Sequence, residues 1–412
     1  MTNHPNPKES RNPKWEGAKQ SNHAVVREPS LAIRHSFVIW LSSFVILSVL
    51  PAAAQWTTQT INLTEGWNGV FFHVAPPTNT LTQLITAEPN IQEIWLWRPT
   101  VTSQQYVESP EQPTTGGSRW MSWARTNVAG SDLKTLIGNA AYLVRMAGTA
   151  SESWPLKGKP VPPRYQWTQS GLNFIGFQTR PTAPTFSQFF TGIQIGTELG
   201  VQAYGYNGEL TPMEVIAPAT RLLKRGEAYW FRAGSYNRYF GPFGLLLSDA
   251  SGINFGTTVG RQRVVVRNVT DQDISVSVQL NVSETPPAGE VAITGVPPLI
   301  VRGELNTADL TYSATNFLSQ PSQMMTWNLK KKNTPGSAVE IILGINRNAM
   351  SGSVGSLYAG ILRFTDSLNL TQVDVPVSAG KESLKGLWVG DAIVTEVRHN
   401  LLQKPIAAGG GN

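Results

Sequence analysis

Cysteine is absent from the 412 residues of this chain. Its absence excludes disulfide bonds, cysteine-ligated zinc and thiol nucleophiles, whatever the compartment. Charged residues are also few, at 15%, against a hydrophobic fraction of 41%, which is typical of a folded chain rather than a disordered one. Only two of the five histidines, His73 and His399, lie beyond residue 54. Histidines so far apart lack the close ligand spacing of most zinc sites, so we expect no metal and no cofactor.

Catalytic motifs are missing as well. The sequence contains no Gly-x-Ser-x-Gly nucleophile elbow, no Walker phosphate loop and no dinucleotide-binding glycine pattern. His73 is the natural candidate for a Ser-His-Asp triad, but its equivalent in the repeat described below is Gln178, which favours a structural role. Paired carboxylates for glycoside hydrolysis stay open, because the fold sets their spacing. We expect no enzyme, and keep a glycoside-active enzyme as an alternative.

Basic charge is modest outside the first 54 residues. The formal net charge is +6, but residues 1–54 hold six Lys or Arg against three Asp or Glu, so the remainder carries +3. The only tight basic run is 330–332, Lys-Lys-Lys, and the Asn-Thr-Pro-Gly after it is typical of a solvated hairpin turn. The only tight acidic pair, Asp271 and Asp273, is also interpreted as a hairpin turn rather than a calcium site. Without a clustered basic face we expect no nucleic-acid partner.

An export signal stands near the start of the sequence. Residues 36–50 read SFVIWLSSFVILSVL, preceded by Arg34-His35 and followed by Pro-Ala-Ala-Ala at 51–54. A basic flank, an apolar core and small residues in that order are typical of a secretory signal peptide. As a helix, fifteen residues rise only about 22 Å, short of a bilayer core. We expect cleavage before Gln55, with an uncleaved anchor as the alternative and membrane contact only through that segment.

The chain contains a duplication. Residues 66–74, GWNGVFFHV, return at an offset of 105 as residues 171–179, GLNFIGFQT, and TLTQLI at 80–85 returns as TFSQFF. Farther on, AYLVR at 141–145 returns as AYWFR at 228–232, now at an offset of 87. Self-similarity of this kind predicts two copies of one module.

Each copy is expected to hold strands around one short helix. Thr80 and Thr185 stand where a helix N-cap is favoured, ahead of apolar residues at i, i+3 and i+4. An aromatic strand follows in each copy, Trp-Leu-Trp at 95–97 and Tyr-Gly-Tyr at 204–206, and the Ala-Tyr strand and a proline-containing strand then close the copy.

The first copy has an insertion that the second lacks. The offset falls by 18 residues between the two ends, which places extra residues within about 98–127. Insertions in repeats usually form surface loops, and such loops often bear binding surfaces. Trp120, Trp123 and Tyr106 could therefore form an exposed aromatic platform for a glycan or another partner. The alternative is that the tryptophans pack on the sheet, as large aromatics mostly do.

The Gly-Trp-Asn strand combined with a later Ala-Tyr strand resembles tandem β-rich modules of secreted and surface proteins of environmental bacteria. The resemblance covers residues 61–247, with Leu172 in the second copy where the first has Trp67. It implies an extracellular structural or adhesive module.

The C-terminal part changes to short β-branched runs separated by turns. Ile274 to Val282 alternates strictly between apolar and polar residues, which indicates a strand with one buried face. Regular short strands favour a β-sandwich. Asn254-Phe255-Gly256, with the Val-Val-Val-Arg-Asn at 264–268, resembles immunoglobulin-like sandwiches of the hydin and abnormal-spindle type, which implies an interaction or spacer module. The expected strands are 261–267, 274–282, 291–294, 338–345, 357–364 and 372–377.

The predicted fold is mainly β: two related β-rich modules with a short helix each, then an immunoglobulin-like β-sandwich. The predicted divisions are 1–54 (polar leader and signal peptide), 55–164 and 165–250 (the two modules), 251–381 (the sandwich), and 382–412 (an extra strand and tail, interpreted as a truncated further module or an added edge strand).

The predicted function is that of a non-enzymatic structural or adhesive interaction protein of the bacterial cell surface. The expected partner is a protein or polysaccharide outside the cytoplasm, with the protein itself extracellular, on the cell surface or periplasmic. The first alternative is a carbohydrate-binding protein that uses exposed tryptophans of the inserted loop.

Overall fold

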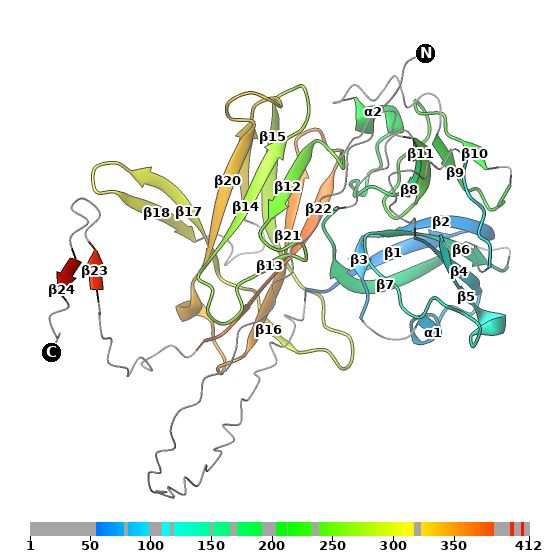
Figure 1. Ribbon diagram of the computed structural model, residues 1–412, viewed down its shortest axis with the longest axis horizontal. Helices are drawn as coiled ribbons and strands as arrows, with labels where there is room; N and C mark the ends of the chain where they lie inside the picture. Colours follow the sequence, from blue (N-terminus) through cyan, green and yellow to red (C-terminus); the bar gives the residue numbers. More distant parts are fainter. Residues whose placement is uncertain are drawn as a thin grey trace, which may run out of the picture. The chain divides into compact units, whose positions relative to one another are not determined.

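The computed structural model describes residues 55–77, 81–98, 109–115, 119–148, 151–164, 171–191, 203–211, 213–232, 239–316, 323–382, 396–398 and 405–407. The predicted signal segment, Thr80, Tyr106 and most of the predicted strand after residue 382 lie outside them. The described residues are mainly β, as predicted, and belong to one compact unit (Figure 1). Within them we find no helix with the length and hydropathy that crossing a membrane requires.

The first module contains two sheets that enclose an apolar core. One sheet has the order β2-β6-β4-β5 and the other the order β1-β7-β3. Its elements are β1 (Thr57–Leu63), β2 (Gly66–Phe72), β3 (Val74–Ala75), α1 (Leu81–Leu84), β4 (Ile91–Trp97), β5 (Trp120–Ala124), η1 (Arg125–Asn127), β6 (Ala140–Met146) and β7 (Glu152–Pro160).

The second module repeats the larger of these sheets. Its order β8-β11-β9-β10 matches β2-β6-β4-β5 strand for strand. Thr185 caps α2 in a capping box, because its side chain accepts from the Gln188 backbone while the Gln188 side chain accepts from the Thr185 backbone. The elements are β8 (Leu172–Ile175), α2 (Phe186–Phe190), β9 (Ala203–Gly205), β10 (Glu214–Val215) and β11 (Tyr229–Arg232).

Strand register confirms the duplication. Val70 pairs with Tyr142 in the first module, and Ile175 pairs with Tyr229 in the second, so both sequence offsets are kept across the ladder. The Tyr142 hydroxyl accepts from the backbone N–H of Ile137, and the Tyr229 hydroxyl accepts from that of Lys224, its equivalent. Asn68 of β2 and its equivalent in β8, Asn173, also make the same hydrogen bonds to the backbone. The two copies therefore share one scaffold.

The strand predicted to close the second module belongs elsewhere. In the first module, the proline-containing strand β7 pairs with β1 and β3. Its counterpart, β12 (Phe243–Leu247), instead pairs with β14 (Arg261–Asn268) at the edge of a five-stranded sheet of the C-terminal part. The prediction that this strand completes the second copy was wrong, because sequence similarity does not specify a pairing partner.

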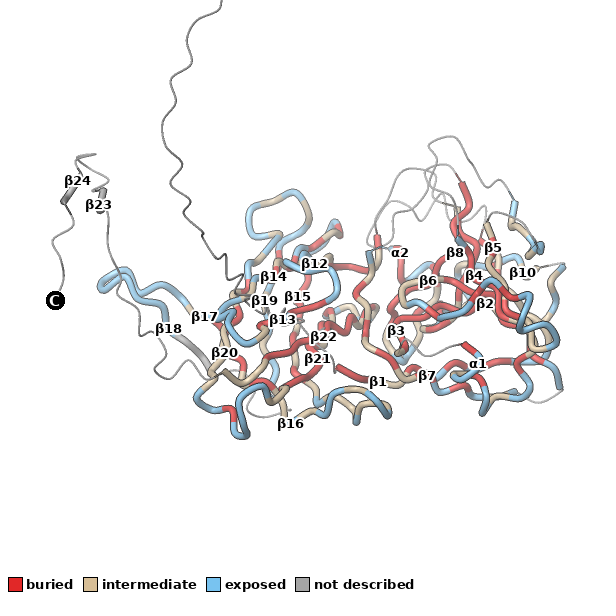
Figure 2. Tube along the Cα trace, turned by 60° about the horizontal axis from the view of Figure 1, so that its bottom comes forward, coloured by how far each residue is buried: buried red, intermediate tan, exposed pale blue. Residues whose placement is uncertain are grey.

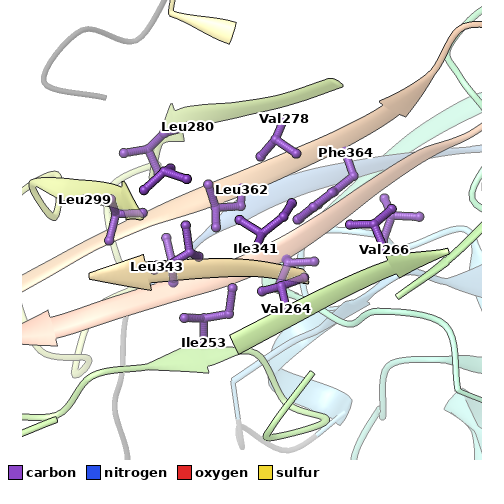
Figure 3. Packing of buried hydrophobic residues seen from close by; sticks show 14 of the residues in the cluster. Ile253, Val264, Val266, Val278, Leu280, Leu299, Ile341, Leu343, Leu362 and Phe364 are labelled. Atoms are coloured by element: carbon purple, nitrogen blue, oxygen red, sulfur yellow. The ribbon is translucent and has the colours of Figure 1, made fainter. Parts of the chain in front are cut away.

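The C-terminal part is a sandwich of two sheets, as predicted. The orders are β12-β14-β20-β17-β18 and β13-β22-β21-β15-β19, with β16 pairing in parallel to β21. Alternate side chains of both sheets fill the core between them (Figure 3). The remaining elements are β13 (Ile253–Asn254), β15 (Ile274–Val282), β16 (Ile293–Gly295), β17 (Leu299–Asn306), β18 (Thr311–Asn316), β19 (Met324–Leu329), β20 (Ala338–Ile345), η3 (Arg347–Ala349), β21 (Leu357–Asp366) and β22 (Gln372–Gly380), followed by the pair β23 (Glu396–Arg398) and β24 (Pro405–Ala407).

The charged turns connect the two sheets of the sandwich. The lysine run lies between β19 and β20, and the acidic pair lies between β14 and β15, so each joins strands of different sheets and neither is the hairpin turn we predicted. The two turns bind each other, with Lys332 3.0 Å from Asp271 and Lys330 2.9 Å from Asp273. Two of the three lysines are thus neutralised within the protein.

The hairpin of β17 and β18 projects from the sandwich (Figure 1). Only Leu299, Ile300 and Val301 of β17 pair with β20, so beyond them the hairpin is a two-stranded ribbon. Leu310 at its tip has a φ of 57° and is 75% exposed. A left-handed leucine is strained, because its Cβ crowds the following carbonyl oxygen.

Replacing Leu310 by asparagine is expected to steady this ribbon. Asparagine tolerates the left-handed region, and the relief amounts to about 1 kcal/mol. Amide hydrogen exchange of the hairpin should therefore slow by about fivefold. Leu305→Asn, which changes an exposed leucine at an ordinary φ, is the control. Unchanged or faster exchange in Leu310→Asn would contradict the strain argument.

Candidate functional site

The two tryptophans predicted to lie in the inserted loop belong to β5 and are buried. Trp120 is 4% exposed and Trp123 is 2% exposed, so neither presents the open face that a stacking platform needs. The predicted exposed platform was wrong for this pair, and the alternative, packing on the sheet, is confirmed. Tyr106 lies outside the described residues, so its predicted role stays a prediction.

The reason is their position on a strand. Both residues belong to β5, and residues three apart on a strand point to opposite faces. Trp123 joins the core of the first module and donates its indole N–H to the Thr82 hydroxyl at 3.3 Å. Trp120 faces the other way, toward the second module.

Trp120 belongs to an aromatic layer between the modules, which we call the inter-module layer. Trp97 packs on Trp120 with ring centroids 4.9 Å apart and on Trp230 at 5.0 Å. Phe174 stacks on Trp230 at 4.8 Å, and the Trp230 indole donates to the Tyr206 hydroxyl at 2.8 Å. β4 and β8, which carry Trp97 and Phe174, are largely buried (Figure 2). The modules are therefore joined by a buried aromatic layer, in addition to the separate apolar core that each module has.

A cleft of about 940 Å³ opens beside this layer, and we call it the inter-module cleft. Its walls are parts of β1 and β2 on one side and the segments 206–209 and 221–229 on the other. Main-chain hydrogen bonds join the two walls: Trp67 N–H donates to the Gly208 carbonyl at 2.7 Å, and Ala228 N–H donates to the Gly69 carbonyl at 3.0 Å. A Cβ at Gly66 would lie 2.1 Å from the Gly208 oxygen, so this crossing requires glycine.

A charge cluster stands on the second-module wall of the cleft. Arg221 contacts Glu214 and Glu227, each at 3.1 Å, and lies over the ring of Tyr229. Burial opposes its charge, but the two carboxylates outweigh this and raise the pKa of Arg221. Burial, followed by Glu227, raises the pKa of Tyr229, whose hydroxyl donates to Glu227 at 2.7 Å. The two carboxylates that face each other here are thus held by one guanidinium.

The cations that line the cleft are all paired. Each has a carboxylate within 4 Å, on the cleft wall or just behind it. The pairs are Arg145 with Glu93, Arg221 with Glu214 and Glu227, Lys224 with Glu227, and Arg225 with Asp374.

His73 lies behind the cleft, where the two copies meet, and is 2% exposed. Its Nε2 accepts from the Gly226 N–H at 3.3 Å, and no partner for its buried Nδ1 is found among the described residues. Its carbonyl accepts from the N–H of Val161, whose own carbonyl accepts from Gln178, the equivalent of His73 in the second copy. These contacts are those of a packed residue at the joint between the copies.

The position of His73 predicts acid sensitivity. Burial, with the charge of Arg225 second, lowers the pKa of His73 well below its ordinary value of 6.5, so the folded state holds it neutral. The stability from this site is therefore full above pH 6.5 and is lost as the pH falls below it, by at most about 1.4 kcal/mol per pH unit. Urea unfolding between pH 7.5 and 5.0 should show this slope.

His73→Gln places the second copy's residue in the first and should flatten that part of the pH dependence. The comparison uses the difference between the two proteins, since buried Asp366 also titrates and burial raises its pKa. Parallel pH profiles for the native chain and the variant would show that His73 does not carry the effect.

A second polar joint connects the second module to the sandwich. Arg225 donates to the carbonyls of Thr179 and Gln372 at 3.0 and 2.9 Å and lies 3.8 Å from Asp374. Asp374, almost fully buried, also accepts two hydrogen bonds from Arg363 at 2.8 and 3.1 Å. The second module is thus tied to the sandwich at one stretch of β22.

Sequence reasoning missed the cleft. The sequence offers one signal for it. Trp67 of the repeat is replaced by leucine, Leu172, in the second copy, which indicates that Trp67 has a role that the shared scaffold does not require. Among the described residues no group of three or more histidine or acidic side chains stands close enough to hold a metal ion.

Comparison with known proteins gives no family. No family model matches the chain, and no curated protein matches it. Among solved structures it is similar to the ASH/PapD-like domain 7 of human CEP192 at 10% identity, covering 34% of this chain and 87% of that one with a TM-score of 0.20. It is similar to the CsuC–CsuE chaperone–tip subunit complex of Acinetobacter baumannii at 11% identity, covering 33% of this chain and 56% of that one with a TM-score of 0.18. It is also similar to the CupB6 tip adhesin of Pseudomonas aeruginosa at 9% identity, covering 82% and 94% with a TM-score of 0.19. These likenesses are too distant to assign the chain to a family.

Proposed function

We propose that this protein is an exported, non-enzymatic structural or adhesive protein of the bacterial surface, acting as a rigid spacer that carries a binding surface. The observation that carries the proposal is the fusion of its three β parts into one unit. The second module gives β12 to the sandwich, and the inter-module layer joins the two copies.

The first module is also fastened directly to the sandwich. Trp56 forms a bridge to Glu284, and its N–H donates to the Ser283 hydroxyl at 2.8 Å. Thr58 binds the Glu284 carboxylate with both its N–H and its hydroxyl. Parts joined by main-chain hydrogen bonds hold a fixed separation, which suits a spacer better than a hinge-closing enzyme.

The charge cluster supports the non-enzymatic part of the proposal. A glycosidase needs one carboxyl as acid and one as base or nucleophile, both free to meet substrate. Glu214 and Glu227 are instead occupied by Arg221, and Glu227 is further bound by Lys224 and Tyr229.

The test is export followed by adhesion. The full chain, tagged at its C-terminus and produced in a bacterial host, should be recovered outside the cytoplasm with a new N-terminus near Gln55. Beads coated with it should adhere to bacterial cell-envelope preparations and release no reducing sugar from them. Cytoplasmic retention, or sugar release that is lost in Glu227→Gln, would overturn the proposal.

A further inference from the structure

We infer that the inter-module cleft binds a neutral polysaccharide, with Trp67 as its stacking surface. The inference deepens the adhesive function proposed above, on which its biological meaning rests. It concerns residues different from the buried pair of the inserted loop. At about 940 Å³ the cleft has the size of a ligand site, and main-chain hydrogen bonds join its two walls.

The charges of the cleft favour an uncharged ligand. Every cation on its walls is already paired with a carboxylate, so a phosphate or a uronic acid would find no free positive charge. Two carboxylates, Glu65 and Glu209, line the cleft and have no ion-pair or side-chain hydrogen-bond partner in the described part of the chain. Bringing an anion beside them would be repulsive.

The free polar groups match sugar hydroxyls. Carboxylates accept hydrogen bonds from neighbouring hydroxyls and form the stronger, charge-assisted kind. Asn207 and Trp67 also line the cleft, and their side chains carry an amide and an indole N–H that can donate hydrogen bonds. A ligand that offers hydroxyl donors and acceptors along an uncharged chain satisfies this set.

Trp67 supplies the apolar contact that a sugar ring needs. The indole is half-buried, packs against the inter-module layer and also lines the cleft. Its backbone is fixed by a pair of hydrogen bonds with Gly208, and its packing against the inter-module layer restricts the ring. The second copy has buried Leu172 at the equivalent position, so of this pair of residues only Trp67 can offer an aromatic face.

Binding of named probes to the mature chain tests the inference. Cellohexaose, maltohexaose and chitohexaose would be titrated by calorimetry, with polygalacturonate as the anionic probe. We expect at least one neutral hexasaccharide to bind, and polygalacturonate not to bind. Trp67→Ala should weaken that binding by about tenfold or more, and Glu209→Gln by about threefold.

Two matched variants show whether the effect belongs to the cleft. Trp327→Ala removes a half-buried tryptophan of β19, and Glu304→Gln neutralises an exposed glutamate of β17; both should bind like the native chain. Trp67→Phe keeps an aromatic face and should retain most of the affinity if Trp67→Ala proves unstable. Three outcomes would each overturn the inference. Either no neutral probe binds, or Trp67→Ala, Trp67→Phe and Glu209→Gln all keep full affinity, or polygalacturonate binds more tightly than the neutral probes.

This outcome is distinguishable from failure of the proposed function. If coated beads adhere to cell envelopes and Trp67→Ala beads adhere equally, the adhesive function stands and the cleft inference falls. If neutral hexasaccharides bind at the cleft but the chain is not exported, the cleft inference stands and the surface function falls.

Discussion

Trp230→Ala is expected to destabilise the protein by about 3–5 kcal/mol, the usual cost of emptying a buried tryptophan site. Trp230 is 0% exposed and contacts residues of both modules. Removing it leaves a cavity between Trp97 and Phe174 and leaves the Tyr206 hydroxyl without its donor. Urea unfolding followed by far-UV circular dichroism measures the loss.

Two comparisons make this result specific. Trp230→Phe keeps an aromatic ring beside Phe174 and should lose clearly less. Tyr312→Ala removes an exposed ring from the hairpin and should change the free energy of unfolding by less than about 1 kcal/mol. A loss below about 1 kcal/mol for Trp230→Ala would show that the modules do not depend on their shared layer.

Asp374→Ala is the second large effect, also expected at about 3–5 kcal/mol, because it removes one partner of a buried ion network. Arg225 would keep its bonds to the carbonyls of Thr179 and Gln372 but lose its carboxylate. Burial lowers the pKa of Arg225 and Asp374 raises it, so the variant leaves a poorly solvated charge at the joint.

The control for this variant is an exposed ion pair on the same sandwich. Glu340→Ala breaks the pair with Arg263, in which both side chains are exposed, and should cost less than about 1 kcal/mol. Chemical denaturation at low and high salt separates the two, since a buried pair is screened less than an exposed one. Equal losses for both variants would remove Asp374 from its assigned role.

Much of the scaffold could be predicted from local pattern. The strict alternation of residues 274–282 corresponds to β15, in which one face is buried and the other is partly exposed. The sequence offsets of 105 and 87 correspond to equivalent strand registers in two sheets. Each of these features can be recognised from short, continuous stretches of sequence. β17 and β18 were missed, because beyond Val301 they form an exposed ribbon without a continuous apolar face for a periodicity search to detect. β19, which pairs with β15 at the edge of its sheet, was also missed, and Leu329 is its only fully buried residue.

The candidate site could not be predicted, because it lies between two copies. A repeat shows what one copy does alone, and the packing of copies against each other depends on residues far apart in sequence. The spacing of Trp120 and Trp123 did contain usable information. On a strand, residues three apart place their rings on opposite faces. Assigning a strand to these residues would therefore have excluded a single platform made of both.

Because β12 follows the second module in sequence but pairs with β14 of the sandwich, the boundaries of any fragment of the protein have to be chosen accordingly. A fragment beginning at residue 251 would present Val264, Val265 and Val266 of β14 as a bare sheet edge, because their partner residues would be on the discarded side. Bare edges invite pairing with other chains. Fragments meant for crystallisation or for display should therefore begin before Phe243, and a swap of the second repeat for another would have to bring its own matching border strand.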